Sequence, residues 1–166
     1  MNDIIAHYLY IGRSEKMRLS LSKATILDCA EIHNLQITSF RQLQEKYQNG
    51  PGAEKPERTM QKMQESFTDY YFICLYGKHI GGLRICHFAN LCKLKQIFIL
   101  PEYQEHGYAQ EAIALVESLY PKTQKWELDT IEQEDKLCYL YEKMGYKKTG
   151  KTQKIKDGMD IVYYAK

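Results

Sequence analysis

The fold is decided by IFILPEYQEHGYAQEAIALVESLY, residues 97–120. Its first four residues are continuously apolar, which is typical of a strand end that is covered on both faces. A proline and a polar turn with a single glycine, Gly107, follow. From Ala109 onward the apolar residues recur at helical spacing until Pro121 ends the pattern. The stretch therefore predicts a strand that leads through a glycine turn into a helix.

The turn at residues 104–109 lies where backbone N–H groups can bind an anion. The first N–H groups of a helix have no acceptor within the helix, and the helix dipole favours negative charge there. Gly107 has no side chain and lets a ligand approach the backbone closely. The turn contains no Lys or Arg, so main-chain groups would hold the anion. A glycine that only relieves crowding between strand and helix explains the spacing equally well.

The rest of the chain alternates between strand-like and helix-like patterns, which predicts a mixed α/β fold around a largely antiparallel sheet. The last predicted helix has Asp135 as its N-cap and Gly145 at its C-terminal end. The lysine-rich segment KKTGKTQKIK is expected at a solvated edge. Strands are predicted within residues 16–22, 69–88, 91–101, 125–131 and 157–166, and helices within 23–48, 58–67, 109–120 and 134–146.

The composition excludes several classes of protein. The 166 residues are 44% hydrophobic and 27% charged, as expected of one globular domain over 1–166, with 1–16 as an N-terminal extension. A net charge of +2 argues against nucleic acid, and no apolar run approaches the ~20 residues of a membrane helix. The five cysteines form no metal-ligand spacing, so we expect a reduced, metal-free, cytoplasmic protein.

Three elements, in order, resemble the GNAT superfamily of N-acetyltransferases. Gln104, Gly107 and Ala109 stand at the defined positions of its acyl-CoA-binding signature, Q/R-x-x-G-x-G/A. The preceding IFILPEY is similar to the family's strand ending in V-x-P, and LYEKMGY, residues 140–146, resembles its L-Y-E-K-x-G-F/Y element. The resemblance implies a sheet whose two central strands splay apart, between the strand ending at Leu100 and KWELDTI.

The resemblance also implies a site for acetyl-CoA as acyl-donor co-substrate. The pantetheine arm would pair with main-chain groups of Ile97, Phe98 and Ile99, and an oxyanion would be stabilised by a backbone N–H near Ile99. Tyr141 would be the general acid that protonates the departing thiolate. The pyrophosphate would be wrapped by the backbone of Gln104, Glu105, His106, Gly107, Tyr108 and Ala109.

The chain departs from the family pattern in two respects. The segment LCKLKQIFIL has no Asp or Glu, so the strand carboxylate that some members use as a base has no equivalent. A water chain ending at Glu102, Asp129 or His87 is the remaining route, and no base is assigned. Glu134 and Leu137 stand where the family often has Asn and Ala, which puts one side-chain contact to pantetheine in doubt.

The sequence thus predicts an N-acetyltransferase that moves an acetyl group from acetyl-CoA to a primary amine of a small molecule, peptide or protein, by direct attack in a ternary complex. The alternative is a non-catalytic acyl-CoA-binding sensor or interaction module, which Glu134, Leu137 and the missing strand carboxylate slightly favour and Tyr141 disfavours. A P-loop nucleotide-binding protein is excluded, because no G-x-x-x-x-G-K-[ST] motif occurs. A homodimer is the expected assembly on general grounds alone, since two-fold pairs are the commonest.

Overall fold

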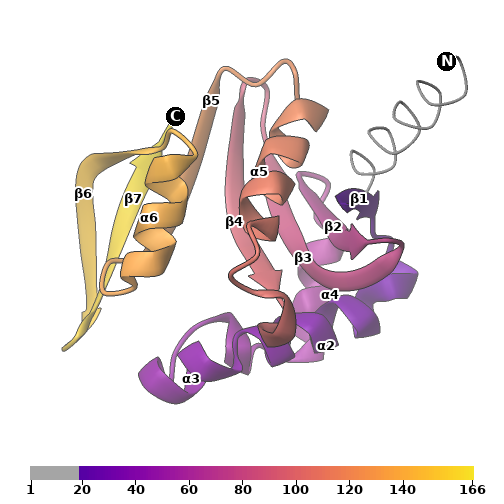
Figure 1. The fold of residues 1–166 in the computed structure, drawn as a ribbon, viewed down its shortest axis with the longest axis horizontal. Helices are drawn as coiled ribbons and strands as arrows, with labels where there is room; N and C mark the ends of the chain where they lie inside the picture. Colours follow the sequence, from indigo (N-terminus) through magenta and orange to yellow (C-terminus); the bar gives the residue numbers. More distant parts are fainter. Residues whose placement is uncertain (1–18) are drawn as a thin grey trace, which may run out of the picture.

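The fold is a seven-stranded sheet with helices on both faces (Figure 1). The structure is a computed structural model and describes residues 19–166. The strands lie in the order β1-β2-β3-β4-β5-β7-β6, and every neighbouring pair is antiparallel except β4 with β5. The predicted mixed α/β fold around a largely antiparallel sheet is therefore confirmed. The expected extension at 1–16 lies outside the described residues.

The elements follow the predicted order. The strands are β1 (Leu19–Lys23), β2 (Thr68–Leu75), β3 (Lys78–His87), β4 (Leu91–Ile99), β5 (Lys125–Ile131), β6 (Lys147–Lys156) and β7 (Met159–Ala165). The helices are α2 (Cys29–Ser39), α3 (Arg41–Tyr47), α4 (Pro56–Gln64), α5 (Tyr108–Leu119) and α6 (Asp135–Lys143). Three short 3-10 turns, η1 (Ile26–Asp28), η2 (Pro51–Ala53) and η3 (Pro101–Tyr103), precede α2, α4 and α5.

The structure decides between one and two helices over residues 23–48 and corrects the N-cap predicted at Asp135. The long segment 23–48 divides at Phe40, whose backbone (φ −92°, ψ 4°) leaves the helical range between α2 and α3. The N-cap of α6 is Glu134 rather than Asp135, which is the first helical residue. Gly145 follows α6 with φ 89°, the left-handed conformation that glycine adopts readily. All ten residues of β6 are exposed at the sheet edge, as expected for the lysine-rich segment.

The core has one hydrophobic layer on each face of the sheet. Residues of α5 and α6 pack on one face, and residues of α2 pack on the other, with Met63 of α4. Along β4 the side chains alternate between the layers: Ile97 and Ile99 belong to the α5/α6 layer and Phe98 to the α2/α4 layer. The prediction that this strand end is covered on both faces is therefore confirmed.

β4 and β5 separate part-way along their length. Their parallel pairing ends at Leu94 with Leu128, although both strands continue beyond these residues. A bulge in β4 leaves Lys95 without a register partner on β3 at the same point, and bulges bend the strand that contains them. Figure 1 shows β5 turning away from β4. The splay implied by the family resemblance is present, and we call the unpaired region beyond Leu94 and Leu128 the opening.

Helix α3 connects the part of the molecule that contains β1 to β4 with the part that contains α6 and β6. Tyr47 Oη and Lys46 Nζ donate hydrogen bonds of 2.6 and 2.5 Å to Glu134 Oε1, at the start of α6. Lys156 Nζ of β6 donates to the main-chain carbonyl of Tyr47. Figure 1 shows α3 below the opening, between the two parts. The splayed sheet is thus held by a short β4–β5 ladder and by these contacts.

No helix in the part of the chain that the structure describes is both long and apolar enough to cross a membrane.

Candidate active site

The edge of β4 that faces the opening carries main-chain groups without a strand partner. The Phe98 carbonyl points toward β3, because a Cβ built on Gly81 would lie only 2.1 Å from its oxygen. Main-chain groups alternate in direction along a strand, so those of Ile97 and Ile99 point away from β3 and toward the opening. Of the three residues expected along the pantetheine arm, two therefore present their main chain to the opening, and Phe98 does not.

The turn at residues 104–109 presents backbone N–H groups to solvent. Glu105 (φ 63°) and Gly107 (φ 80°) both lie in the left-handed region, an arrangement that can direct successive N–H groups toward one anion. Within residues 19–166 the N–H groups of Glu105, His106 and Gly107 donate to no backbone carbonyl. α5 begins directly afterwards, at Tyr108. In the described part of the chain, three successive N–H groups without a strong backbone acceptor therefore stand directly before the N-terminus of α5.

Crowding does not explain the glycine of this turn. A Cβ built on Gly107 would meet no atom within 4 Å. What the position requires is the left-handed φ of 80°, which non-glycine residues rarely adopt, and the space where a side chain would stand is open. A cradle for a phosphate needs both features.

Side chains of the turn hold it in place. Gln104 Nε2 donates a 2.8 Å hydrogen bond to the carbonyl of Ile99, at the end of β4. The exposed ring of His106 lies 2.6 Å from the Gln104 carbonyl through Nδ1. Glu105 forms an ion pair with Lys136 of α6, whose hydrogen bond lowers the pKa of the carboxyl below its usual value. The one carboxylate of the turn therefore faces a cation rather than the N–H groups.

Tyr141 is buried between α6 and the sheet, 7% exposed, beside two other tyrosines. Its ring centroid lies 6.4 Å from that of Tyr146 and 6.3 Å from that of Tyr164. Tyr146 donates to Glu117 and Tyr164 to Glu142, at 2.7 and 2.9 Å. The Tyr141 hydroxyl forms no hydrogen bond with any residue of 19–166. Of these three tyrosines, Tyr141 is therefore the one whose hydroxyl can donate a hydrogen bond to a ligand.

The surroundings of Tyr141 keep its phenol protonated. Burial raises its pKa above the ordinary value of about 10, and the negative charge of Asp129 acts in the same direction. Asp129 follows Leu128, the last residue of β5 that pairs with β4, so this influence comes from the margin of the opening. A protonated phenol can donate a proton to a thiolate formed there.

The three groups considered as ends of a proton path occupy different places. His87 lies opposite Cys92, near the start of β4 and far from the opening. Asp129 lies at the opening but is paired with Lys95 at 3.1 Å. Glu102 is exposed in η3. None of them is oriented toward Tyr141 by a hydrogen bond within 19–166, so the base stays unassigned.

The two departures from the family pattern have structural roles. Burial alone would raise the pKa of Glu134, but the hydrogen bonds from Lys46 and Tyr47 outweigh it and hold that pKa below its usual value. Glu134 is therefore an ionised anchor for α3. Leu137 packs against the α5/α6 layer. Sequence reasoning missed the role of Lys46 and Tyr47, because no local pattern links them to a residue almost ninety positions away.

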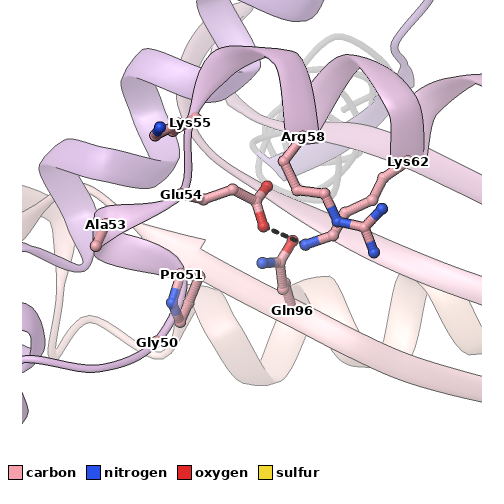
Figure 2. A pocket seen from close by; sticks show the side chains of 8 residues that line it. All are labelled: Gly50, Pro51, Ala53, Glu54, Lys55, Arg58, Lys62 and Gln96. Carbon is pink, nitrogen blue, oxygen red and sulfur yellow. Dashed lines mark hydrogen bonds and ion pairs between the residues drawn. The ribbon is translucent and has the colours of Figure 1, made fainter.

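A pocket lies on the α2/α4 face of β4, beside α4 (Figure 2). Its volume is about 470 Å³, and its lining includes Glu54, Arg58, Lys62 and Gln96. Gln96 lies one residue beyond the bulge of β4, so the pocket adjoins the opening from the side opposite α5 and α6. Sequence reasoning did not single out these residues, since a charged segment after two glycines carries no distinctive motif.

Comparison with known proteins identifies the family. The model of the acetyltransferase (GNAT) family matches residues 31–146, and the chain belongs to this family. Among curated proteins no sequence matches significantly. No group of three or more His, Cys, Asp and Glu side chains suited to a metal occurs within the described residues.

Solved structures share the fold. An acetyltransferase from Thermus thermophilus aligns with a TM-score of 0.72 and 13% identity, over 90% of this chain and 97% of the other. PaiA N-acetyltransferase from Thermoplasma acidophilum, in complex with coenzyme A, aligns with 0.72 and 17%, over 90% and 99%. Spermidine N-acetyltransferase from Vibrio cholerae, in complex with coenzyme A and spermine, aligns with 0.71 and 21%, over 90% and 95%.

Proposed function

We propose that the protein is an acetyl-CoA-dependent N-acetyltransferase that acts on a primary amine by direct attack in a ternary complex. The observation that carries this proposal is the opening between β4 and β5, which ends beside a turn with free N–H groups. The two structural neighbours that contain coenzyme A support this class of ligand.

The chain's own residues fit an extended thioester that ends in a diphosphate. The N–H groups of Glu105, His106 and Gly107 would hold the diphosphate at the N-terminus of α5, where the helix dipole favours negative charge. Main-chain groups of Ile97 and Ile99 would pair with the amides of the arm, as an added strand does. The Ile99 carbonyl already accepts from Gln104, so its N–H is the group that remains for the ligand.

The reaction needs two proton movements. Bound acetyl-CoA supplies an acetyl thioester, so a C–N bond to the amine forms while the C–S bond breaks. Tyr141 would donate its proton to the leaving sulfur, and the proton lost by the amine would restore the phenol through solvent. The Ile99 N–H would donate to the thioester carbonyl oxygen, where negative charge develops. The products are an N-acetylated amine and free CoA thiol.

We extend the proposal to the setting of the protein. Residues 1–166 would form one domain, working in the cytoplasm without metal and as a homodimer. All five cysteines are buried thiols without disulfide bonds, which fits a reducing compartment.

Two measurements on the full chain test the proposed function. Acetyl-CoA at 100 times its dissociation constant should raise the free energy of unfolding by about 2.7 kcal/mol, seen as a higher melting temperature. Thiol release should then follow addition of an amine. A melting shift without thiol release from any amine would favour the sensor alternative, and the absence of a shift would overturn the proposal.

A further inference from the structure

Three polar side chains form a row across the sheet on the α2/α4 face. Tyr70 of β2 lies opposite Arg84 of β3, and Arg84 lies opposite Gln96 of β4. Each has a buried polar atom without a hydrogen-bond partner in the part of the chain that the structure describes: Tyr70 Oη, Arg84 Nε and Gln96 Oε1. Arg84 acts electrostatically on the Tyr70 hydroxyl, and native proteins rarely leave such buried atoms unsatisfied, so the row is a place where ordered water or a bound molecule completes the hydrogen bonding.

Arg84 is the member of the row that most requires a partner. Its side chain is only 8% exposed, and no ion pair engages it within residues 19–166. Burying a cation without an anion is costly. The carboxylate of Glu54 is committed elsewhere, because it accepts a 2.9 Å hydrogen bond from Thr59 and forms an ion pair with Lys62. The described residues therefore provide no anion as a partner for Arg84.

The pocket of about 470 Å³ lies directly beside this row, since Gln96 lines it. Figure 2 shows the ammonium of Lys62 reaching Glu54 beside Gln96, with the guanidinium of Arg58 extending from α4 next to the Lys62 side chain. Lys55 also lines the pocket, so three cations stand against one carboxylate. A ligand with negative charge would gain from this imbalance, whereas a purely cationic polyamine would be repelled.

Gln96 also connects the pocket to the opening. It is the neighbour of Ile97, whose main-chain groups face the opening, and consecutive Cα atoms are only ~3.8 Å apart. A ligand group at Gln96 Oε1 therefore lies next to the segment where the thioester is proposed to bind. Gln96 Oε1 can only accept a hydrogen bond, and an amine has the N–H to donate.

We propose that this pocket selects the acetyl acceptor: an amine that also carries an anionic group, a carboxylate or a phosphate. Arg58 and Lys62, which line the pocket, bind the anionic group, with the buried Arg84 as a further positive charge beside Gln96. Gln96 Oε1 accepts a hydrogen bond from the amine and directs it toward the opening. The inference rests on the proposed N-acetyltransferase function and adds the class of its acceptor.

Matched pairs of amines test the inference in the wild-type protein. Thiol release from acetyl-CoA is compared for tyrosine and tyramine, histidine and histamine, phosphoethanolamine and ethanolamine, and glucosamine 6-phosphate and glucosamine, with spermidine as the purely cationic probe. We expect the anionic member of at least one pair to have a kcat/KM at least ~10-fold above its neutral partner, as one charge-assisted contact provides. Comparing the carboxylate pairs with the phosphate pairs shows which of the two anionic groups the pocket prefers.

Variants locate the effect. Arg58→Gln should raise KM for the preferred anionic amine by ~10-fold with little change for its neutral partner, while the melting shift with acetyl-CoA is retained. Arg41→Gln removes an exposed arginine of α3 outside the pocket and serves as the matched control. Gln96→Leu should lower turnover of both members of the pair, because it removes the acceptor for the shared amine.

The possible failures are distinguishable. A retained acetyl-CoA shift with equal or better use of the neutral amines or of spermidine would overturn the inference and leave the proposed function standing. Loss of selectivity in Arg41→Gln as large as in Arg58→Gln would also overturn it. Absence of both the acetyl-CoA shift and thiol release would overturn the proposed function itself, and the inference with it.

Discussion

The carboxamide of Gln104 donates a 2.8 Å hydrogen bond to the main-chain carbonyl of Ile99. This contact fastens the amide-presenting turn to the end of the strand that borders the opening. The two regions proposed to hold acetyl-CoA, the edge of β4 and the turn, are therefore fixed relative to each other. The Gln104 side chain thus positions the turn, whereas Gly107 of the same family signature acts through its backbone conformation.

Replacing Gln104 with leucine tests this connection. The change keeps the approximate shape of the side chain but removes the hydrogen bond to Ile99, worth about 1 kcal/mol. We expect acetyl-CoA to bind about 5-fold more weakly, as measured by calorimetric titration. Gln42→Leu, at an exposed position of α3, is the matched control and should leave the affinity unchanged. Wild-type affinity in Gln104→Leu would show that the turn does not need this contact.

Gly107→Val should abolish the acetyl-CoA melting shift. The branched side chain would occupy the space in front of the N–H groups and would also strain a backbone at φ 80°. Gly150→Val is a close control, since Gly150 has φ 86° and equally open surroundings but lies in β6. The control should lose a similar amount of stability yet keep the shift. Loss of the shift in both variants would mean that strain, rather than the cradle, is responsible.

Tyr141→Phe should preserve the acetyl-CoA shift and lower kcat by about 100-fold, the lower range for loss of an acid catalyst. Because burial raises the pKa of Tyr141, its acid form persists and kcat should show no loss from this group up to about pH 10. Tyr146→Phe removes a hydroxyl that donates to Glu117 and should reduce stability but not kcat. Equal kcat in Tyr141→Phe and wild type would remove Tyr141 from the mechanism.

The contact between α3 and α6 predicts a pH-dependent contribution to stability. Tyr47→Phe deletes one hydrogen bond to an ionised carboxylate and should cost about 1.5 kcal/mol in urea unfolding at pH 7. Because Glu134 has a lowered pKa in the folded protein, the contribution is present above about pH 4.3 and declines as the pH falls through the folded value. Tyr139→Phe, at a 64% exposed side chain, should change stability by less than about 0.5 kcal/mol. A difference that grows at acid pH would contradict this account.

Glu105→Gln should strengthen acetyl-CoA binding. The change removes a negative charge from the turn and releases Lys136 to interact with a phosphate. We expect an affinity gain of about 3-fold at low salt that shrinks as salt screens the exposed charges. Glu45→Gln, an exposed carboxylate of α3, should have no such effect. Weaker binding of acetyl-CoA to Glu105→Gln would indicate that the ion pair with Lys136 shapes the turn.

Much of the fold could be predicted because local patterns determine it. The apolar run at 97–100 is buried on both faces, and the helical stripe after Gly107 forms α5, as the periodicity indicated. The divergence of β4 from β5 was available only through the resemblance to a family. The bulge at Lys95, which coincides with the end of the β4–β5 pairing, has no signature in a segment that alternates regularly.

The parts of the site that could not be predicted depend on contacts between segments that are distant in the sequence. Glu134 was considered for its bearing on pantetheine, but it anchors Tyr47, 87 positions earlier in the chain. The row formed by Tyr70, Arg84 and Gln96 exists only because three strands align in register. Register follows from the pairing of whole strands, so no single segment reveals which polar side chains will meet.

The bulge at Lys95 has a consequence for kinetics. Because it belongs to the folded backbone, β4 and β5 stand apart before any ligand arrives, and no ladder hydrogen bonds have to be broken to admit one. Binding of the thioester arm should therefore be a one-step bimolecular reaction, with an observed rate constant proportional to ligand concentration. A rate that levels off at high ligand concentration would indicate a slow step in which the strands separate first.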